Sequence, residues 1–449
     1  MSDLDLDALA EQFATFHARF APLFYRAEVR ARSARYLRAL LSPIARKNGW
    51  QVAEAMGEAD PNGAQRLLYA ARWDADGVRD ELQRFVMEHF GDPDGGILIV
   101  DETGFLKKGD QSVGVARQYS GTAGKVDNCQ VGVFLGYASP RGATFLDRRL
   151  YLPDGWATDP ARRATAHVPT DVVFQTKPTL ARTMLAQAFT NGVVAGWVSA
   201  DSLYGCDRAL WVWLARRRQP FVLGVRRDER VWVDEGDARR QQLVATVADE
   251  LPATAWQRLS AGNGSKGPRW FDWAWVPIAG LRQDDWQHWL LVRRSVSEPT
   301  DLAYSHVAGP AATTLAEAVR VAGARWTIEQ CLEEAKGETG LDEYEVRSWP
   351  SWYRHITLSL VAHAFLAWAR QTANAAGVAG DGAGRGAMVG AGNATAAGAD
   401  AASLTRQPSL PVSVVGLATA TSGPGTQQSL PSARRDLSTC PASPYYVRL

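Results

Sequence analysis

Two apolar runs that each end in an aspartate constrain the fold of this chain more than any other feature. Residues 97–100 precede Asp101, and residues 193–200 precede Asp201. Short apolar runs of this kind are typical of strands buried in a sheet. A third acidic residue, Glu329, lies far downstream in a stretch with helical spacing. We therefore expect two aspartates at strand ends and one glutamate on a late helix.

These three carboxylates suit the binding of divalent metal ions. Carboxylate oxygens are the hard ligands that Mg²⁺ prefers, and two such ions about 3.5–4 Å apart can activate an attacking oxygen and stabilise a leaving one. Asp101, Asp201 and Glu329 are thus candidate catalytic residues and metal ligands for phosphoryl transfer. In the alternative interpretation, an aspartate after a strand only caps a turn or a helix. Glu102 competes with Asp101, which is preferred because it directly follows the apolar run.

The order of the expected elements indicates an α/β fold. Residues 4–92 have helical spacing of apolar residues, with a turn at 60–63. The elements expected next are strands at 97–100, 130–138 and 144–152, a helix at 178–189, a strand at 193–200, a helix at 207–217 and a strand at 220–225. Three strands followed by helix, strand, helix and strand is the order of an RNase H-like sheet.

Residues 228–312 separate this sheet from the helix that is expected to follow it. Short alternating runs at 270–276 and 286–293 predict a β-rich insertion, whose tryptophans are more often core residues than base-stacking platforms. The late helix then begins with a capping box, Thr314 to Glu317, and ends at Gly337 or Gly340. A further helix is predicted at about 355–370.

The composition predicts five segments. They are a helical DNA-binding region at 1–94, the first part of the core at 95–227, the insertion at 228–312, the catalytic helix and last core helix at 313–372, and a tail at 373–449. The tail is rich in Ala, Gly, Ser and Pro and lacks apolar periodicity, so it is predicted to be disordered. A frameshifted end of a degraded gene would have a similar composition.

Charge is balanced overall but clustered locally. The formal net charge is only +1, so the total does not argue for a nucleic-acid partner, whereas the distribution does. Basic residues gather between Arg19 and Lys47, next to a stretch at 48–73 with a weak helix-turn-helix pattern. The candidate DNA contacts in this cluster are Arg30, Arg32, Arg35, Arg38, Arg46 and Lys47. The alternative is a solvated helical face.

No feature of the sequence predicts secretion or a membrane span. The four cysteines are scattered without C-x-x-C spacing, the N-terminus lacks the pattern of a signal peptide, and the apolar stretch at 358–368 is too short to cross a bilayer. We expect a cytoplasmic protein with no membrane partner.

Two basic residues share the predicted helix face of Glu329. Arg325 lies four residues before it and Lys336 seven after it, so all three fall on nearly one face. Cations beside a metal-binding glutamate suit a phosphate backbone, although a solvated face with a salt bridge has the same spacing.

Lys107, Lys108 and Lys125 are further candidate DNA contacts. Lys125 belongs to a glycine-rich turn that lacks two residues of a phosphate-binding loop.

The chain resembles bacterial DDE insertion-sequence transposases of the branch with a Tyr-x2-Arg-x3-Glu-x6-Lys signature. The segments that carry the resemblance are 99–109, 200–205, 325–329 and 340–349, and the similarity extends over about residues 10–370. The signature tyrosine is replaced by Ala322, which removes a side chain that helps to position DNA phosphate in such enzymes. The resemblance implies an RNase H-like catalytic core, a β-rich insertion before the glutamate, and metal-dependent DNA cleavage and strand transfer.

The resemblance also implies cofactors and partners. Asp101, Asp201 and Glu329 would hold two Mg²⁺ ions, for which Mn²⁺ can substitute. Water would attack a phosphodiester at the end of the element, and the freed 3′-OH would attack target DNA. The implied partners are double-stranded DNA of the element ends and the target, with a homodimer on paired ends. Two alternatives stay open: a transposase remnant that only binds DNA, and a stand-alone RNase H-like nuclease.

Overall fold

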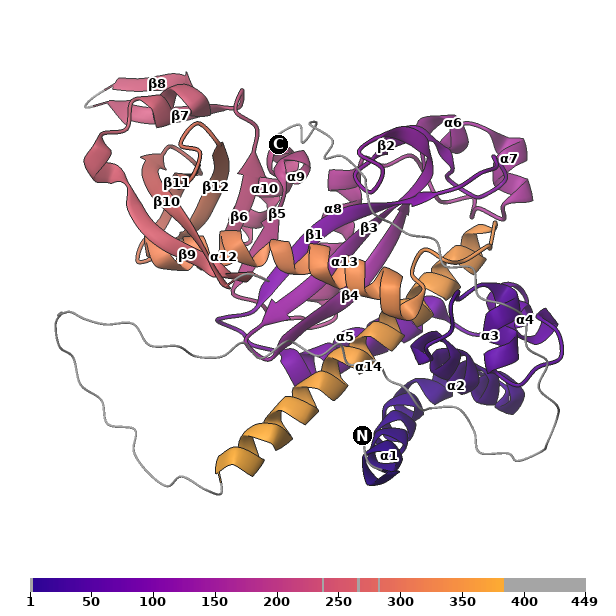
Figure 1. Ribbon diagram of the computed structural model, residues 1–449. Helices are drawn as coiled ribbons and strands as arrows, with labels where there is room; N and C mark the ends of the chain where they lie inside the picture. The colour runs from indigo at the N-terminus through magenta and orange to yellow at the C-terminus, as the bar shows by residue number, and fades with distance from the viewer. Residues whose placement is uncertain (1–2, 236–237, 265–266, 282, 383–449) are drawn as a thin grey trace, which may run out of the picture. The chain divides into compact units, whose positions relative to one another are not determined.

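The computed structural model describes residues 3–235, 238–264, 267–281 and 283–382, and the chain forms two compact units (Figure 1). The first unit contains residues 3–199 and 323–382, and the second contains residues 200–322. None of the helices in these described ranges is both long and apolar enough to cross a membrane. The predicted α/β class is confirmed, since both helices and a large mixed sheet are present.

The first unit begins with helices, as the apolar spacing predicts. They are α1 (Asp3–Phe20), the short helix η1 (Ala21–Leu23), α2 (Ala27–Leu41), α3 (Gly49–Ala55), α4 (Asn62–Tyr69) and α5 (Ala75–Phe90). Side-chain caps fix two of the starts: Asn48 accepts hydrogen bonds from the first turn of α3, and Asp74 does so for α5. The turn predicted at 60–63 begins between α3 and α4, and its last two residues are the first of α4.

A twisted sheet follows the helices. Its strands are β1 (Ile97–Leu106), β2 (Ala116–Ser120), β3 (Lys125–Ser139), β4 (Gly142–Tyr151) and β5 (Trp197–Ala200). β3 is the centre, pairing antiparallel with β1, β2 and β4. β5 begins next to β1, where the Trp197 N–H donates to the Gly96 carbonyl.

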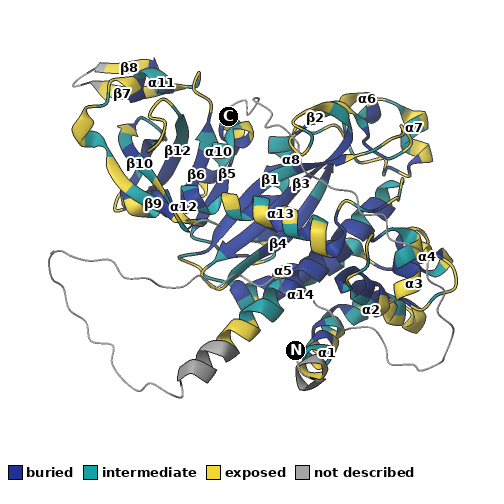
Figure 2. Ribbon diagram, in the orientation of Figure 1, coloured by how far each residue is buried: buried dark blue, intermediate teal, exposed yellow. Residues whose placement is uncertain are grey.

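Helices cover both faces of this sheet. The connecting helices α6 (Asp154–Ala157) and α7 (Pro160–Thr165) lead to α8 (Lys177–Thr190), which packs on β3 and β4. On the other face lie α13 (Trp326–Thr339) and the long α14 (Trp349–Gly382), which cross the strands in Figure 1. Gly136 allows α13 to approach, because a Cβ there would clash with Ile328. The strands beneath are almost wholly buried (Figure 2).

The N-terminal helices pack against α14, which also packs on the sheet. The hydrophobic core of the N-terminal helices is therefore continuous with that of the sheet. Phe13 and Phe16 of α1 pack against Phe365, and the Tyr36 hydroxyl lies 3.0 Å from Nδ1 of His355. The last helix is longer than predicted at both ends, and its buried side chains, such as Ile356 and Phe365, lie in the part that was predicted. It runs past the predicted boundary at residue 372, and residues 383–449 of the predicted tail lie outside the described residues.

The second unit is built mainly from strands. It begins with α9 (Ser202–Gly205), α10 (Arg208–Arg216) and β6 (Phe221–Val225), and closes with most of α12 (Leu315–Ala324). Between them lie β7 (Arg230–Glu235), β8 (Ala238–Leu243), α11 (Val244–Asp249), η2 (Ala253–Ala255), β9 (Gln257–Gly264), β10 (Gly267–Ile278), β11 (Trp286–Ser295) and β12 (Leu302–Pro310). The strands follow the order β6-β12-β11-β10-β9, with β7 and β8 as a separate pair. All of β7 to β12 fall in the segment predicted to be β-rich.

Candidate active site

Asp101 lies inside β1 rather than at its end, and the predicted strand end was wrong. Pairing with β3 continues from Ile97 to Leu106, and Asp101 sits opposite Phe134. The ladder extends because β3 is long enough to pair with the polar half of β1 as well as with its apolar half. The carboxylate is therefore held on a rigid strand, and its side chain is 15% exposed.

Strand alternation separates Asp101 from its neighbour Glu102. Side chains on one face of β1 meet the α13 side, where Thr103 accepts a hydrogen bond from Lys336 and Asp101 lies beside Arg325. Glu102 points to the opposite face and forms an ion pair of 2.9 Å with Lys177 at the start of α8. Of these two adjacent acids, only Asp101 faces the helix that carries Glu329.

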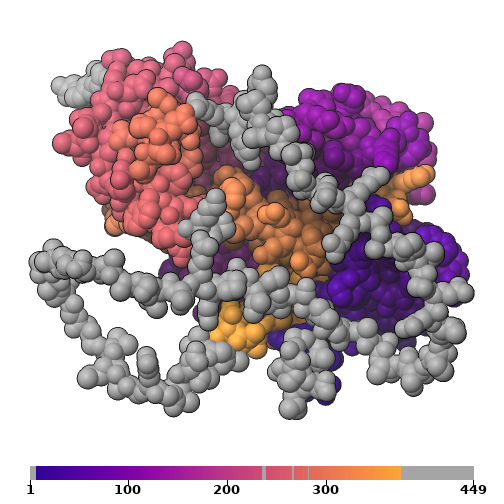
Figure 3. All heavy atoms as spheres, in the orientation of Figure 1, coloured from indigo at the N-terminus to yellow at the C-terminus, as the bar shows by residue number. Residues whose placement is uncertain are grey.

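Asp101 and Glu329 meet at one guanidinium group. Arg325 Nη1 lies 2.7 Å from Glu329 Oε1 and 3.7 Å from Asp101 Oδ2. The side chains of Arg325 and Glu329 are each 34% exposed, so the group is accessible yet partly desolvated, which strengthens its charge interactions. Atoms of the orange helical segment that contains α13 reach the surface in Figure 3. Two carboxylates distant in the chain thus share one cationic centre.

Arg325 is the residue that precedes the first turn of α13, the helix that contains Glu329. A continuous helix was predicted from residue 314, but α12 ends at Ala324 and α13 starts at Trp326, with Arg325 between them. The predicted start and end are confirmed: the Thr314 hydroxyl accepts from the Glu317 N–H at 3.2 Å, and Gly340 ends α13 with a φ of 64°.

Lys336 faces the same side of α13 as Arg325 and Glu329. Its Nζ donates to Thr103 Oγ1 at 2.8 Å and to Thr122 Oγ1 at 3.1 Å. Burial lowers the pKa of Lys336, against the opposing effect of Asp342. The lysine therefore connects α13, β1 and the turn after β2, while its predicted contact with DNA stays a prediction.

Asp201 belongs to the second unit and directly follows β5, as predicted. Its Oδ1 accepts a hydrogen bond of 2.9 Å from the Leu203 N–H, so the side chain caps α9. The capping alternative thus holds for one of its two oxygens. Within the described parts of the chain, no group of three or more His, Cys, Asp and Glu side chains forms a metal site. The convergence of Asp201 with Asp101 and Glu329 stays a prediction.

Comparison with known proteins identifies the family. Residues 19–267, more than half of the chain, match the DDE superfamily endonucleases. The chain belongs to this family. The matched segment includes Asp101 and Asp201, and Glu329 lies beyond it. The resemblance to insertion-sequence transposases is confirmed by a relative named as a probable transposase for insertion sequence element IS701, from Microchaete diplosiphon, which is 31% identical over 167 residues.

Each alignment covers only part of this chain and part of the similar protein. The IS701 alignment takes in 37% of this DDE endonuclease and 40% of the relative, so the chain matches well under half of that relative's length. A solved structure of the piggyBac transposase synaptic complex with hairpin DNA aligns with 71% of this chain and 59% of its own, at 11% identity and a TM-score of 0.32.

Of the other predicted DNA contacts in this DDE endonuclease, Lys107 is half-buried and makes contacts within the protein. Its Nζ lies 3.6 Å from the centroid of the Tyr344 ring and 3.1 Å from the Tyr344 carbonyl oxygen. Burial lowers the pKa of Lys107 to about 8. Lys108 is exposed, and Lys125 is exposed beside Asp127 at 3.4 Å.

Most of the N-terminal basic cluster makes internal contacts. Arg32 and Arg35 both pair with Oε1 of Glu58, at 3.0 and 3.5 Å. The Arg38 guanidinium lies 4.9 Å from the centroid of the Phe13 ring, and Arg30 donates to a backbone carbonyl at 3.0 Å. These cations hold the helices together, which sequence proximity alone does not reveal.

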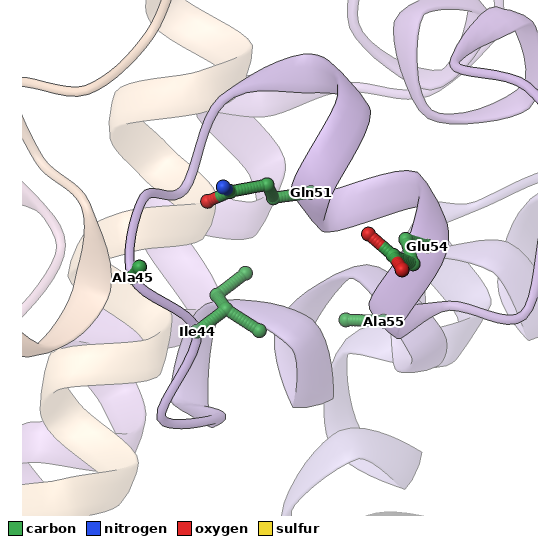
Figure 4. Close-up of a pocket in the computed structure, with 5 residues that line it drawn as sticks. All are labelled: Ile44, Ala45, Gln51, Glu54 and Ala55. Atoms are coloured by element: carbon green, nitrogen blue, oxygen red, sulfur yellow. The ribbon is translucent and has the colours of Figure 1, made fainter. Parts of the chain in front are cut away.

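The last two residues of the basic cluster differ in exposure: Lys47 is buried and Arg46 is exposed. Lys47 is 6% exposed, its side chain packs against Gly340, and its backbone N–H donates to Glu343. Burial lowers the pKa of Lys47, which leaves it little surface for DNA, whereas Arg46 is exposed. Beside them, α3 and the loop before it form an open pocket of about 380 Å³ (Figure 4), lined by Ile44, Ala45, Gln51, Glu54 and Ala55.

Two residues of the site were not predicted from the sequence. Thr103 could have been found from strand alternation, because it lies two residues after Asp101 on the same face. Thr122 carries no local signal, since only folding of the turn after β2 brings it 3.4 Å from the Thr103 hydroxyl.

Proposed function

We propose that this DDE endonuclease is a DNA transposase that cleaves at the ends of an element and joins them to target DNA. The observation that carries the proposal is the meeting of Asp101 and Glu329 at the Arg325 guanidinium. A nuclease needs carboxylates that converge from separate elements, and a helix surface alone would not bring a strand aspartate to Glu329. The similarity to a probable insertion-sequence transposase supports the choice of reaction.

An RNase H-like core is proposed as the framework of this chemistry. Its support is the order of β1, β3 and β4 as antiparallel neighbours, followed by α8 and then by β5 next to β1. In this framework residues 228–312, which lie within the second unit, are an insertion before the helix that carries Glu329. Asp101 on β1 and Asp201 after β5 would then lie on adjacent strands.

The residues present fit divalent metal. Asp101 and Glu329 offer the hard oxygen donors that such ions prefer, and they converge on the two sides of the Arg325 guanidinium, beside which an ion would bind. Asp201, Asp101 and Glu329 are proposed to hold two Mg²⁺ or Mn²⁺ ions. When bound, such ions supply an activated oxygen nucleophile and stabilise the leaving oxygen. Arg325 orients the Glu329 carboxylate, and its remaining N–H donors are available to the scissile phosphate.

The proposed partners follow from the reaction. They are double-stranded DNA of the element ends and of the target, and a second copy of this chain when two ends are paired. Lys336, Lys108, Lys125 and Arg46 are the cations proposed to contact the DNA backbone. A cytoplasmic location is proposed with them.

The test is detection of joined product as well as cleavage. Purified full-length protein is incubated with Mg²⁺, a duplex that carries the DNA flanking its gene, and a target plasmid. Wild type should cut and join, while Asp101→Asn, Asp201→Asn and Glu329→Gln should each lose cleavage by about a thousandfold or more and still bind DNA. Glu102→Gln is the matched control and should cut within a few-fold of wild type. Equal cleavage by Asp101→Asn and Glu102→Gln would refute the proposed site.

A second candidate is a protein that occupies element ends without cutting them. It is favoured by Ala322, which stands where the signature has a tyrosine. Wild type that binds the ends but neither cuts nor joins would support this candidate. Cleavage without joined product would instead support a stand-alone nuclease. Restoring the signature with Ala322→Tyr should raise cleavage if the missing side chain is the limitation.

A further inference from the structure

A two-stranded ribbon beside the catalytic strand exposes large apolar side chains. It consists of β2 and the first residues of β3. Tyr119 is 59% exposed and Val126 is 53% exposed, and the two are register partners, so they point to the same side of the ribbon. Arg117, two residues before Tyr119, lies on this side as well and is exposed. We call Arg117, Tyr119 and Val126 the outward side of the ribbon.

The opposite side of the ribbon is fastened to β1. Ser120 is only 1% exposed, and it packs so closely on Gly104 that a Cβ at Gly104 would clash with its hydroxyl. At the tip, Thr122 receives the 3.1 Å hydrogen bond from Lys336, which also binds Thr103. The ribbon is therefore a fixed part of the catalytic face, and its exposed side chains are not on a loose loop.

The ribbon lies close to the carboxylates. Thr103 is two residues from Asp101, which corresponds to roughly 7 Å along a strand, and the tip of the ribbon is in hydrogen-bond contact with Thr103 through Thr122. DNA held with its scissile phosphate at Asp101 must pass beside this ribbon, since a duplex groove alone is about 12 Å wide.

We propose, on the basis of the function proposed above, that the outward side of the ribbon enters the major groove next to the cleavage site and reads its bases. The major groove accepts a two-stranded ribbon, and such ribbons bind it with one face on the bases and the other on the protein. The residue types match this role: arginine binds guanine O6 and N7, and apolar side chains contact the thymine methyl group. The charge of Arg117 is also complementary to DNA. Lys125 lies on the fastened side and pairs with Asp127.

The test is a cleavage-preference profile. Full-length protein is given a library of end duplexes with randomised base pairs next to the cut, and cut and uncut pools are sequenced. Wild type should prefer particular bases there. Arg117→Ala should reduce the preference at one or two positions by about tenfold, and Tyr119→Ala should do so at neighbouring positions. Tyr25→Ala is the matched control, because Tyr25 is 60% exposed and lies in the loop between η1 and α2; it should leave the profile unchanged.

The same library is also scored for binding by gel-shift selection, so the result does not depend on cleavage. If wild type binds but cuts no duplex, the proposed function fails while the ribbon remains tested by binding preference. If Arg117→Ala weakens all sequences equally, the arginine contacts only phosphate and the inference is overturned. An unchanged profile in both ribbon variants, with wild-type melting curves, overturns it as well.

Discussion

The carboxylate site and the N-terminal helices both contain clustered cations, but they use them differently. At the carboxylate site, Arg325 joins two acids from separate elements and remains a third exposed. In the N-terminal helices, Arg32 and Arg35 converge on the largely buried Glu58, and Lys47 is buried. The first arrangement places one cation between two acids of the proposed site, while the second pairs two arginines with one acid and buries Lys47, although Arg35 stays 43% exposed. A local excess of positive charge in a sequence therefore does not by itself locate a nucleic-acid surface.

Among the cations that this comparison contrasts, Arg325 has the largest expected effect. Arg325→Ala should lower the single-turnover cleavage rate by about a hundredfold or more, because it removes donors next to the reacting phosphate. Stability should change little, since an exposed i,i+4 ion pair contributes only about 0.3–0.5 kcal/mol. Arg325→Lys keeps the charge but loses the planar fork, so it should recover only part of the rate. A normal rate in Arg325→Ala would remove the contrast between the two regions.

The next effect is on stability, in the N-terminal helices. Glu58→Gln should lower the free energy of unfolding by about 1–2 kcal/mol, because it leaves Arg32 and Arg35 without their shared anion. Cleavage per folded molecule should stay at the wild-type level. Urea unfolding measures the change, with Glu28→Gln as the control, since Glu28 is exposed on α2. A loss of cleavage without a loss of stability would show that this region also serves the reaction.

A smaller effect separates the cations within the cluster. Arg46 is exposed, so Arg46→Ala should reduce the slope of log affinity against log salt by about 0.9 if it neutralises one phosphate. Arg32→Ala should reduce the slope by less, because Arg32 is already paired with Glu58. Fluorescence anisotropy of a labelled duplex across a salt series gives both slopes. Equal reductions would mean that DNA displaces the internal pair.

The last expected effect is a pH dependence at Lys107, which is confined to alkaline pH. Burial lowers its pKa to about 8 in the folded chain, against an ordinary value of about 10.4. Between these two values the unfolded chain retains a proton that the folded chain has released, so this group makes stability rise with pH. Lys107→Met should lose that increment, measured as the difference in urea midpoint between pH 8 and pH 10. Lys108→Met, at an exposed site, should keep the wild-type difference.

Local patterns were sufficient for much of the fold. Helical spacing predicted the N-terminal helices, the capping box predicted the start of α12, and Gly340 predicted the end of α13. The spacing of four and seven residues placed Arg325, Glu329 and Lys336 on one side of a helix. These features depend on residues within a few turns of one another, where backbone geometry alone decides the outcome.

Long-range contacts decided the rest. β1 extends through Asp101 because β3 pairs with it, and the predicted continuous helix is divided at Arg325, a few residues after the boundary between the two units. Lys47 and Lys107 have the same local appearance as exposed lysines, yet they pack against Gly340 and Tyr344 from distant segments.

The sequence by itself determined which residue types could bind metal and phosphate and on which kind of element each would lie. Only the tertiary structure decided that Asp101 and not Glu102 faces Glu329, and which of the many cations stay available. The reason is physical: side-chain periodicity is a property of one element, whereas burial and ion pairing depend on which other elements pack against it.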